Sequence, residues 1–252
     1  MDDWTIWHAE HELRRADPHG FLAITSLNFL TAAPQRFPDA PGEWHTGPDG
    51  VVVDLAPGES LTLDDTVLTG RHSFGVIAER GSIYPAFDDA VVEVAKRGGF
   101  DVIRPRHPSN PLLAKYSGTP AYDFDDRWVV AGRFLPFDSP RDITVGAAVE
   151  GLEHVYSSPG QVEFDGLALT VFNGHTPGAL FALFTDQTSG VTTYAANRSL
   201  AIAPPTADGS VVLDFNRATN LPCAYTEFAT CPLPPAENRL AIAVEAGEKK
   251  PV

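Results

Sequence analysis

The sequence has only two cysteines, few basic residues and no long apolar run. Two cysteines in 252 residues cannot make a disulfide framework, which fits a reducing compartment. No apolar run approaches the roughly 18 residues of a membrane-spanning helix. The first residues lack the basic and then apolar pattern of a signal peptide. The sequence therefore predicts a cytoplasmic protein that has no membrane partner.

Basic residues are outnumbered throughout the chain. There are 18 Lys and Arg against 33 Asp and Glu, which gives a formal net charge of −15. Between Phe37 and Gly70 the chain carries acids but neither Lys nor Arg. A chain this acidic repels nucleic acids and anionic membrane surfaces. We therefore expect no nucleic-acid partner.

The common catalytic and nucleotide-binding motifs are also missing. The sequence contains no G-x-S-x-G, no P-loop, no G-x-G-x-x-G after a strand and no H-E-x-x-H. His8 and His11 are three residues apart, whereas zinc-binding helices usually space two histidines by four. We expect these histidines to lie on a solvated helix face. The sequence predicts no metal and no cofactor.

What the sequence has instead is the pattern of a mainly β protein. Apolar residues at Trp4 and Trp7 predict a helix over residues 4–16, which Asp17, Pro18 and Gly20 end. After it, short apolar or alternating runs are separated by turns rich in Gly, Pro and Asp, which is typical of one or two packed β-sandwich or barrel-like modules. The strongest hairpin signal is Asp165-Gly166.

The expected strands and segments follow from these runs. Strands are predicted at 51–53, 60–63, 75–77, 90–94, 128–131, 143–145, 161–164, 167–172, 180–184, 192–194, 211–216 and 239–245. Prolines crowd the region around residue 110, which indicates a soft boundary. The predicted segments are an N-terminal helix (1–20), a small β module (21–110) and a β domain (111–252).

The C-terminal half has only three basic residues between Asp142 and Glu248, and all are arginines: Arg198, Arg217 and Arg239. Arg suits a bidentate grip on a carboxylate or phosphate, and it stays charged when partly buried. Each arginine could also be a structural ion pair with a nearby acid.

Strand alternation groups some of the polar residues. In 211–216, Asp214 and Asn216 would point to the same face. In 239–245, Arg239 and Glu245 would share a face that carries only alanines between them, which would leave a hollow. We therefore expect Arg239 to be mostly buried and bonded to a carboxylate or carbonyl.

Cys223 and Cys231 lie close together in the sequence and have Pro222 and Pro232 beside them. A metal site would need two more ligands, and no nearby His or C-x-x-C supplies them. A nucleophilic cysteine would need a base, which the sequence neither supports nor excludes. We expect the two cysteines to be neighbours in space, as a disulfide or as two buried thiols.

A resemblance to a known family rests on two stretches: FTDQTSGVTTYAANRSL and LDFNRATNLPCAYTEFATCPLPPAENRLAIAVEAGEK. They closely resemble the bacterial domain-of-unknown-function family 1684 over about residues 128–249. Leu221 stands where the family has the first of two prolines. The resemblance implies a β-rich fold and a polar site, but no reaction. The residues that match its polar motif are Asp186, Thr188, Ser189, Tyr194, Arg198, Asp214, Asn216, Asn220, Glu237, Asn238, Arg239, Glu245 and Glu248.

Two hypotheses from different classes follow. In the first, the chain binds a small anionic molecule and is a candidate metal-free acid–base enzyme. Asp214, Glu237 and Tyr194 would be catalytic, and the ligand would be held by Arg198, Arg239, Asn216, Asn220, Asp186 and Glu245. In the second, the motif is a buried hydrogen-bond network in a non-catalytic structural or interaction module. An open pocket lined by the motif favours the first hypothesis, and polar groups bonded to the backbone favour the second.

Overall fold

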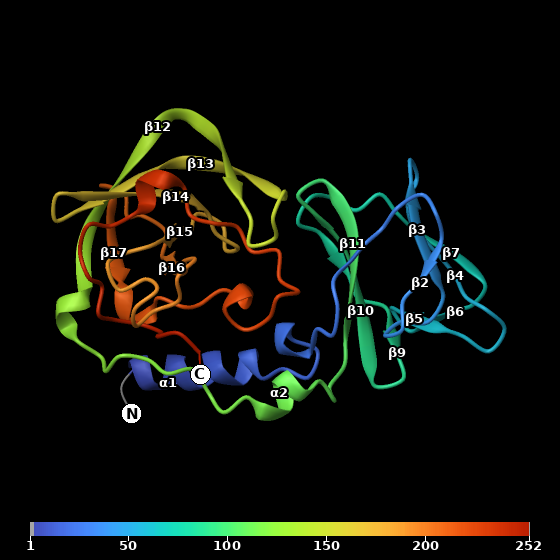
Figure 1. The fold of residues 1–252 in the computed structure, drawn as a ribbon. Helices are drawn as coiled ribbons and strands as arrows, with labels where there is room; N and C mark the ends of the chain where they lie inside the picture. The colour runs from blue at the N-terminus through green and yellow to red at the C-terminus, as the bar shows by residue number, and fades with distance from the viewer. Residues whose placement is uncertain (1–2, 252) are drawn as a thin grey trace. The chain divides into compact units, whose positions relative to one another are not determined.

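The computed structural model describes residues 3–251, and they divide into two compact units (Figure 1). The first unit runs up to Glu12 and then comprises Gly118–Tyr225 and the chain from Thr230 onward. The second comprises Leu13–Ser117 and Thr226–Ala229. The predicted division into segments 1–20, 21–110 and 111–252 stays a prediction.

The predicted N-terminal helix is confirmed as α1 (Asp3–Arg15). The Trp4 indole donates from Nε1 to the Asn216 carbonyl at 3.1 Å, which fixes the start of the helix on the first unit. Within residues 3–251, no helix is long and apolar enough to cross a membrane. A second short helix, α2, spans Pro111–Lys115 and is capped at its N-terminus by Asn110, whose side chain accepts from Leu112 N.

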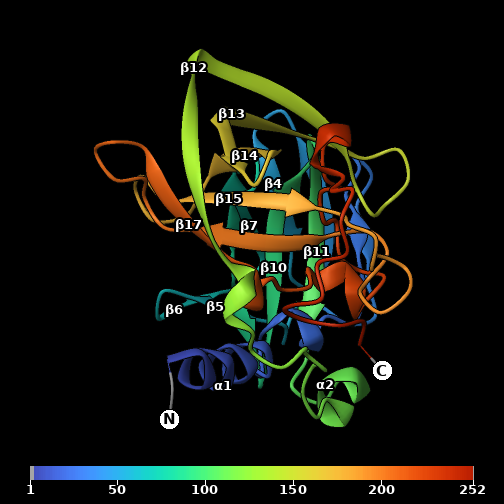
Figure 2. The ribbon, with the colours of Figure 1, turned by 90° about the vertical axis from the view of Figure 1, so that its left-hand side faces the viewer.

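The first unit is built on one antiparallel six-stranded sheet in the order β16-β15-β14-β13-β12-β17. Its two edge strands also contact each other, so the sheet nearly closes into a barrel (Figure 2). Its strands are β12 (Val129–Gly146), β13 (Glu153–Phe164), β14 (Leu167–Asn173), β15 (Leu180–Phe184), β16 (Arg198–Ile202) and β17 (Ser210–Asp214). The long β12 changes register between Pro136 and Arg141, where it arches over the unit.

The predicted hairpin at Asp165-Gly166 is confirmed. Phe164 pairs with Leu167 across a two-residue loop in which Asp165 and Gly166 have φ of 44° and 75°. Two positive φ angles in sequence are the geometry that joins twisted antiparallel strands. Alternate residues of β13 and the strands beside it then fill the barrel core, which includes Val162, Leu169, Val171, Phe184, Leu200, Leu213 and Phe215.

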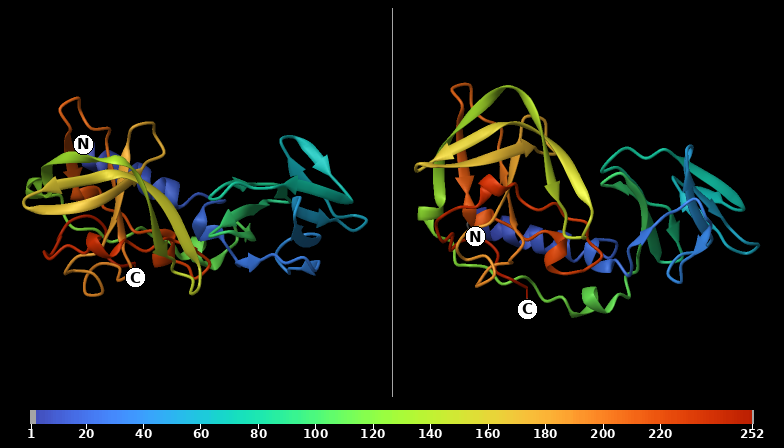
Figure 3. Two further views of the ribbon diagram at one scale, coloured as in Figure 1. Left: turned by 90° about the horizontal axis from the view of Figure 1, so that it is seen from above. Right: turned by 45° about the horizontal axis from the view of Figure 1, so that its top comes forward.

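After β17 the chain becomes irregular, and the red segment in Figure 3 carries no strand arrows. It contains three single-turn 3-10 helices: η3 (Phe215–Arg217), η4 (Pro222–Ala224) and η5 (Ala236–Asn238). A further one, η2 (Asp126–Trp128), precedes β12. Prolines contribute no N–H, so this segment cannot pair as a strand along its whole length.

Four predicted strands are therefore wrong in whole or in part. Residues 192–194 form a turn, and 239–245 are irregular apart from an isolated bridge at Arg239. Strand β17 ends at Asp214, because the next residues form η3. In the second unit, β7 ends at Gly75, so 75–77 is not a strand.

The second unit packs two antiparallel sheets on one core. The larger sheet has the order β1-β11-β10-β9-β5-β6, with β8 also paired to β10, and the smaller has the order β2-β3-β4-β7. The larger contains β1 (Asn28–Phe29), β5 (Leu61–Leu63), β6 (Thr66–Leu68), β8 (Ser82–Ile83), β9 (Ala86–Phe87), β10 (Ala90–Arg97) and β11 (Phe100–Arg106). The smaller contains β2 (Gln35–Arg36), β3 (Glu43–Gly47), β4 (Gly50–Asp54) and β7 (Arg71–Gly75), and the 3-10 turn η1 (Phe21–Ala23) precedes both sheets.

The core of the second unit combines Trp44, Val51 and Val53 of the smaller sheet with Leu61, Val92, Val94 and Ile103 of the larger. At the crossing of β4 and β7 the backbones approach closely. Gly50 has φ of 96°, and a Cβ built on it would lie 1.8 Å from the Gly75 carbonyl oxygen. Only glycine fits this position. The mainly β fold class, with barrel-like and packed-sheet modules, is confirmed.

Candidate functional site

The centre of the C-terminal motif is an ion pair at the base of one hairpin. Asp186 lies two residues after Phe184, the last residue of β15, and Arg198 begins β16 opposite Phe184. The Arg198 guanidinium donates from Nη2 to Asp186 Oδ2 at 2.8 Å, and both side chains are fully buried. Local strand pairing therefore brings together two residues that are twelve apart in the sequence.

The second carboxylate oxygen of Asp186 is occupied by three other donors. Oδ1 accepts from the backbone N and the hydroxyl of Thr188 at 2.7 and 2.6 Å. It also accepts from Val244 N at 3.2 Å. A buried carboxylate needs such donors to offset the loss of hydration. Asp186 thus ties its own turn to the irregular C-terminal segment.

The remaining donors of Arg198 reach the main chain of that same segment. Nη2 also donates to the Val244 carbonyl at 3.0 Å, and Nη1 donates to the carbonyls of Ala246 and, at 3.4 Å, Glu248. Burial lowers the pKa of Arg198, although Asp186 opposes this effect. Arg198 Nε has no partner within residues 3–251. The guanidinium of Arg198 is therefore enclosed by protein, and most of its hydrogen bonds go to main-chain carbonyls.

Asn220 and Glu248 form a second contact of the motif. Asn220 N donates to Glu248 Oε2 at 2.6 Å, and its side-chain Nδ2 donates to the Lys249 carbonyl at 2.7 Å. Glu248 is 2% exposed, and its Oε1 lies 3.4 Å from His11 Nε2. The prediction of a solvated histidine face on the N-terminal helix is therefore wrong for His11, because the helix packs this side against the C-terminal segment.

Asp214 and Asn216 are neighbours, but strand alternation is not the cause. Asp214 caps η3, and its Oδ1 accepts from Asn216 N at 3.1 Å and from Asn216 Nδ2 at 3.0 Å. The Asn216 amide also bonds both main-chain groups of Asp125. Asp214 Oδ2 lies 3.0 Å from Arg217 Nε. Both predicted site residues are thus engaged within the protein.

Glu237 and Asn238 lie next to β14. The buried amide of Asn238 donates from Nδ2 to the carbonyls of Thr170 and Leu183, and its Oδ1 accepts from Thr170 N, all at 2.8 Å. Glu237 is exposed, and its Oε1 accepts from the Thr170 hydroxyl at 3.1 Å. Asn238 therefore acts as a side-chain bridge at the point where regular strand pairing stops.

The expected burial of Arg239 is wrong. Its side chain is exposed, as are those of Glu245, Ala241 and Ala243. Neither of the two hollows described below is lined by residues 239–245, where the sequence predicted one. The main chain of Arg239 is nevertheless held, through a parallel bridge to Thr185.

Tyr194 and the two cysteines form a third contact, and the expectation that the cysteines are neighbours is confirmed. Cys223 N donates to Cys231 Sγ at 3.3 Å, and no disulfide joins the two residues. The Tyr194 hydroxyl donates to the Cys223 carbonyl at 2.7 Å. Burial raises the pKa of Tyr194 to about 12, and the neighbouring Cys223 adds to this effect. Tyr194 therefore remains protonated at neutral pH.

The predicted site residues are thus placed in three ways. Four are buried and bonded to main-chain groups: Asp186, Arg198, Asn216 and Asn220. Asp214 and Tyr194 are half-buried, and Glu237, Arg239 and Glu245 are exposed. Two open hollows of about 520 and 560 Å³ are lined by other residues. The first includes Arg36, Asp88 and His107, and the second includes Arg133, Glu163 and Leu167. Neither hollow is lined by a residue of the motif.

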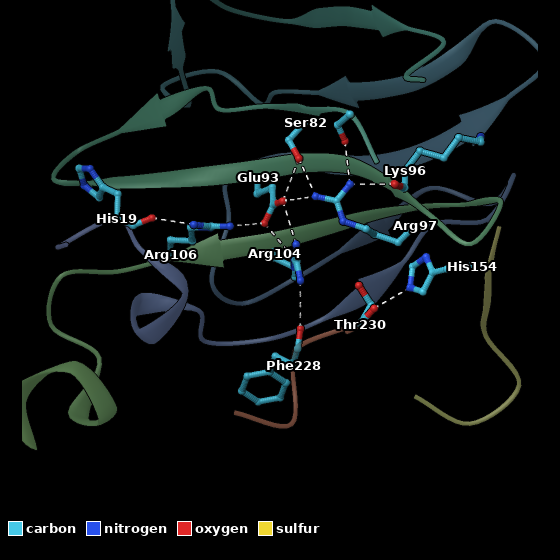
Figure 4. A network of polar contacts seen from close by, with 11 residues as sticks. His19, Ser82, Glu93, Lys96, Arg97, Arg104, Arg106, His154, Phe228 and Thr230 are labelled. Atoms are coloured by element: carbon cyan, nitrogen blue, oxygen red, sulfur yellow. Dashed lines mark hydrogen bonds and ion pairs between the residues drawn. The ribbon is translucent and has the colours of Figure 1, made fainter. Parts of the chain in front are cut away.

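A second polar cluster, which the sequence reasoning missed, lies in the second unit (Figure 4). We call it the arginine cluster, and it consists of Glu93, Arg97, Arg104 and Arg106. Glu93 Oε1 accepts from Arg97 Nη2 at 2.7 Å and from Arg104 Nη2 at 2.8 Å, and Oε2 accepts from Arg104 Nε at 2.9 Å and Arg106 Nη2 at 2.5 Å. Ser82 adds a hydroxyl donor to Oε1.

A sequence signal for the arginine cluster existed. Strands β10 and β11 are joined by Gly98-Gly99 and pair with Glu93 opposite Arg104. Alternation then places Arg97 and Arg106 on the same face. Burial would raise the pKa of Glu93, but the charges and hydrogen bonds of Arg104 and Arg106 outweigh it and lower the pKa to about 2. Glu93 is therefore ionised at neutral pH.

Comparison with known proteins agrees with the motif. The model of a protein family of unknown function, DUF1684, matches residues 114–249, which is more than half of the chain. No curated protein matches the sequence. The solution NMR structure of an uncharacterized protein of Haloarcula marismortui is 29% identical, covers 54% of this chain and 78% of its own, and gives a TM-score of 0.45. From the family match, the chain belongs to the DUF1684 family.

Proposed function

We propose that this chain is a non-catalytic interaction module, and that its C-terminal polar motif is a structural lock. The observation that carries the proposal is the double use of Arg198. Its guanidinium bonds Asp186 on one side and the main-chain carbonyls of residues 244–248 on the other. A side chain used in this way holds the segment in place and has little left for a ligand.

The physical need for such a lock comes from the irregular segment after β17. Buried backbone N–H and C=O groups must be hydrogen-bonded, and a segment without strand partners has to find them elsewhere. Arg198, Asn220 and Asn238 supply donors to the carbonyls of this segment or of the strands beside it. The side chains of the motif thus supply hydrogen bonds that a neighbouring strand would otherwise make.

The candidate catalytic residues support the same proposal. Asp214 is held by Asn216 and Arg217, and Glu237 is exposed on η5. A general acid or base near neutral pH needs a pKa close to 7. The pKa of Tyr194, at about 12, is far from that range. The chain would act by binding, in the cytoplasm, to partners other than nucleic acids or anionic membranes, which its net charge of −15 disfavours.

A thermal-unfolding screen tests the proposal. The wild type, Arg239→Ala and Tyr194→Phe would be melted alone and with a panel of small carboxylic and phosphoric acids. We expect any stabilisation by these acids to be the same in all three proteins. An acid that stabilises the wild type, and loses this effect in a variant with an unchanged melting temperature, would overturn the proposal and restore the motif as a ligand site.

A second candidate function rests on the arginine cluster. Its three guanidinium groups face a single carboxylate, so the four residues carry a formal net charge of +2. Nη1 of each arginine also donates to a main-chain carbonyl. Arg106 Nε is buried and has no partner within the described residues. Guanidinium groups in this state suit a small carboxylate or phosphate. An anionic ligand of the second unit is therefore the alternative that the geometry favours.

Calorimetric titration with inorganic phosphate and with a small dicarboxylate tests this alternative. We expect binding that weakens at least tenfold in Arg97→Gln, provided that circular dichroism shows the variant folded. Arg71→Gln is the matched control, because Arg71 is an exposed arginine of the same unit. Equal binding by the wild type and both variants, or no binding by any of them, would remove the arginine cluster as a ligand site.

A further inference from the structure

The two cysteines are placed for direct chemistry with each other. Cys223 N lies 3.3 Å from Cys231 Sγ. Since a backbone N is about 1.5 Å from its own Cα, that sulfur lies within about 4.8 Å of the Cys223 Cα. The Cys231 sulfur therefore lies beside the Cys223 main chain, within reach of the Cys223 side chain, and the two sulfurs can meet by side-chain rotation.

The surroundings of the two thiols are different. Cys223 is half-buried, whereas Cys231 is buried. A reagent in solution therefore meets Cys223 first. Cys223 lies in the single turn η4, directly after Pro222, and the Tyr194 hydroxyl holds its carbonyl at 2.7 Å. The backbone of the more accessible cysteine is consequently fixed beside the buried one.

The hydrogen bonding around Cys223 favours its reactive form. A hydrogen bond from the Cys231 side chain lowers the pKa of Cys223, although burial opposes this effect. The thiolate is the nucleophile in thiol–disulfide exchange. The half-buried Cys223, whose pKa is lowered, thus lies within reach of the buried Cys231 thiol.

We propose that Cys223 and Cys231 are a reversible dithiol–disulfide site, with Cys223 as the attacking and Cys231 as the resolving thiol. The Cys223 thiolate attacks one sulfur of a low-molecular-weight disulfide, forms a mixed disulfide and releases the other half as a thiolate. Cys231 loses its proton to solvent and attacks the Cys223 sulfur, which expels the second small thiolate. The chain is oxidised by two electrons, which the small disulfide takes up.

Oxidation would close the loop between Cys223 and Cys231 with a covalent bond. This loop contains Thr226–Ala229, the short stretch that the second unit takes from the C-terminal region. Within that unit, Phe228 N donates to the Thr226 hydroxyl at 3.2 Å, and the Phe228 carbonyl lies 3.4 Å from Arg104 Nη1. Closing so short a loop restrains the unfolded chain, so we expect oxidation to raise the melting temperature by about 5 °C.

The test uses oxidised glutathione on the folded full chain, with free thiols then blocked by N-ethylmaleimide and read by intact mass. We expect the wild type to lose two hydrogens and to take up no blocking reagent. Cys231→Ser should stop at a glutathione adduct on Cys223, and Cys223→Ser should form an adduct at least tenfold more slowly. Dithiothreitol should restore both thiols of the oxidised wild type.

Two results would overturn the proposal. One is a wild type that remains folded by circular dichroism and still carries two blocked thiols, although its unfolded chain forms the disulfide under the same conditions. The other is a Cys231→Ser variant that is folded and gives no adduct. Because the first result is read on the wild type, a variant that fails to fold does not remove the test.

Discussion

Arg198 and Asp186 form an ion pair that is closed to solvent, with Nη2 and Oδ2 2.8 Å apart and side chains 1% and 0% exposed. A buried pair of this kind adds little when it is compared with a well-packed apolar pair, but the loss of one partner leaves an uncompensated charge. The value of the pair to this fold lies in the additional bonds of Arg198 to Val244, Ala246 and Glu248.

Arg198→Met is therefore expected to lower the free energy of unfolding by about 3–5 kcal/mol, because the buried Asp186 carboxylate would lose its only cationic partner among the described residues. Urea unfolding followed by circular dichroism measures the effect. Arg239→Ala is the matched control and should change stability by less than about 0.5 kcal/mol, since Arg239 is exposed. The double variant Asp186→Asn, Arg198→Met should lose less free energy of unfolding than the two single variants lose together. Equal losses in Arg198→Met and Arg239→Ala would contradict the assignment of Arg198 as the lock.

Asn238→Ala removes three hydrogen bonds at once and leaves the main-chain groups of Thr170 and Leu183 unpaired in a buried place. Each such group costs about 1–3 kcal/mol, so we expect a loss of about 3 kcal/mol or more. The adjacent Glu237→Ala, on an exposed side chain, should cost less than about 1 kcal/mol. Chemical unfolding measures the free energy of unfolding of both variants. An Asn238→Ala variant as stable as the wild type would show that strand β14 does not need this bridge.

Much of the fold could be predicted from local patterns, because the patterns depend on near neighbours. The N-terminal helix and the hairpin at Asp165-Gly166 are encoded by spacing and by turn residues, and the structure confirms both. The alternation in 239–245 is also real, since Leu240 and Val244 are buried and the residues between them are mostly exposed. What the alternation does not encode is the partner of the backbone, which here is the side chain of Arg198 rather than a strand.

The candidate site could likewise be predicted only where a local pattern identifies its residues. Counting basic residues singled out Arg198 and Arg239 equally, although one is buried and the other exposed. Parity within one strand could have separated them, because Arg198 shares a face with Leu200 and Ile202, both in the barrel core. The contacts of Asn220 with Glu248 and of Asn238 with Thr170 join segments distant in the chain, so no local pattern predicts them.

Glu93→Gln is expected to change the acid stability of the second unit. The pKa of Glu93 is lowered from about 4.5 to about 2, so its stabilisation is fully present above the unfolded value and is lost as the pH falls from about 4.5 towards 2. A shift of this size corresponds to about 3 kcal/mol. The stability difference between the wild type and Glu93→Gln should therefore shrink over this pH range, as measured by urea unfolding. A difference that is constant from pH 6 to about pH 2 would contradict the ionised state of Glu93 in the arginine cluster.

Gly50→Ala tests the close approach of β4 and β7. The new methyl group would meet the Gly75 carbonyl oxygen at 1.8 Å, and the backbone φ of 96° would be strained as well. We expect a loss of about 3 kcal/mol or more, because neither backbone can move without disturbing the sheet. Gly47→Ala lies in the adjacent strand β3 and meets nothing within 4 Å. If thermal unfolding finds the two alanine variants alike, the pairing of β4 with β7 is not as described.

Hydrogen–deuterium exchange of residues 240–249, compared between the wild type and Arg198→Met, tests most directly whether the motif is a structural lock. We expect the amides of this segment to exchange at least tenfold faster in Arg198→Met, while strands β13 and β14 keep more of their protection. Among these amides are Val244 N, which donates to Asp186 Oδ1, and Glu248 N, which donates to the Ala218 carbonyl. Arg239→Ala should exchange like the wild type. Unchanged protection of residues 240–249 in a folded Arg198→Met would show that the motif is not a structural lock, because the segment would then be held without its arginine.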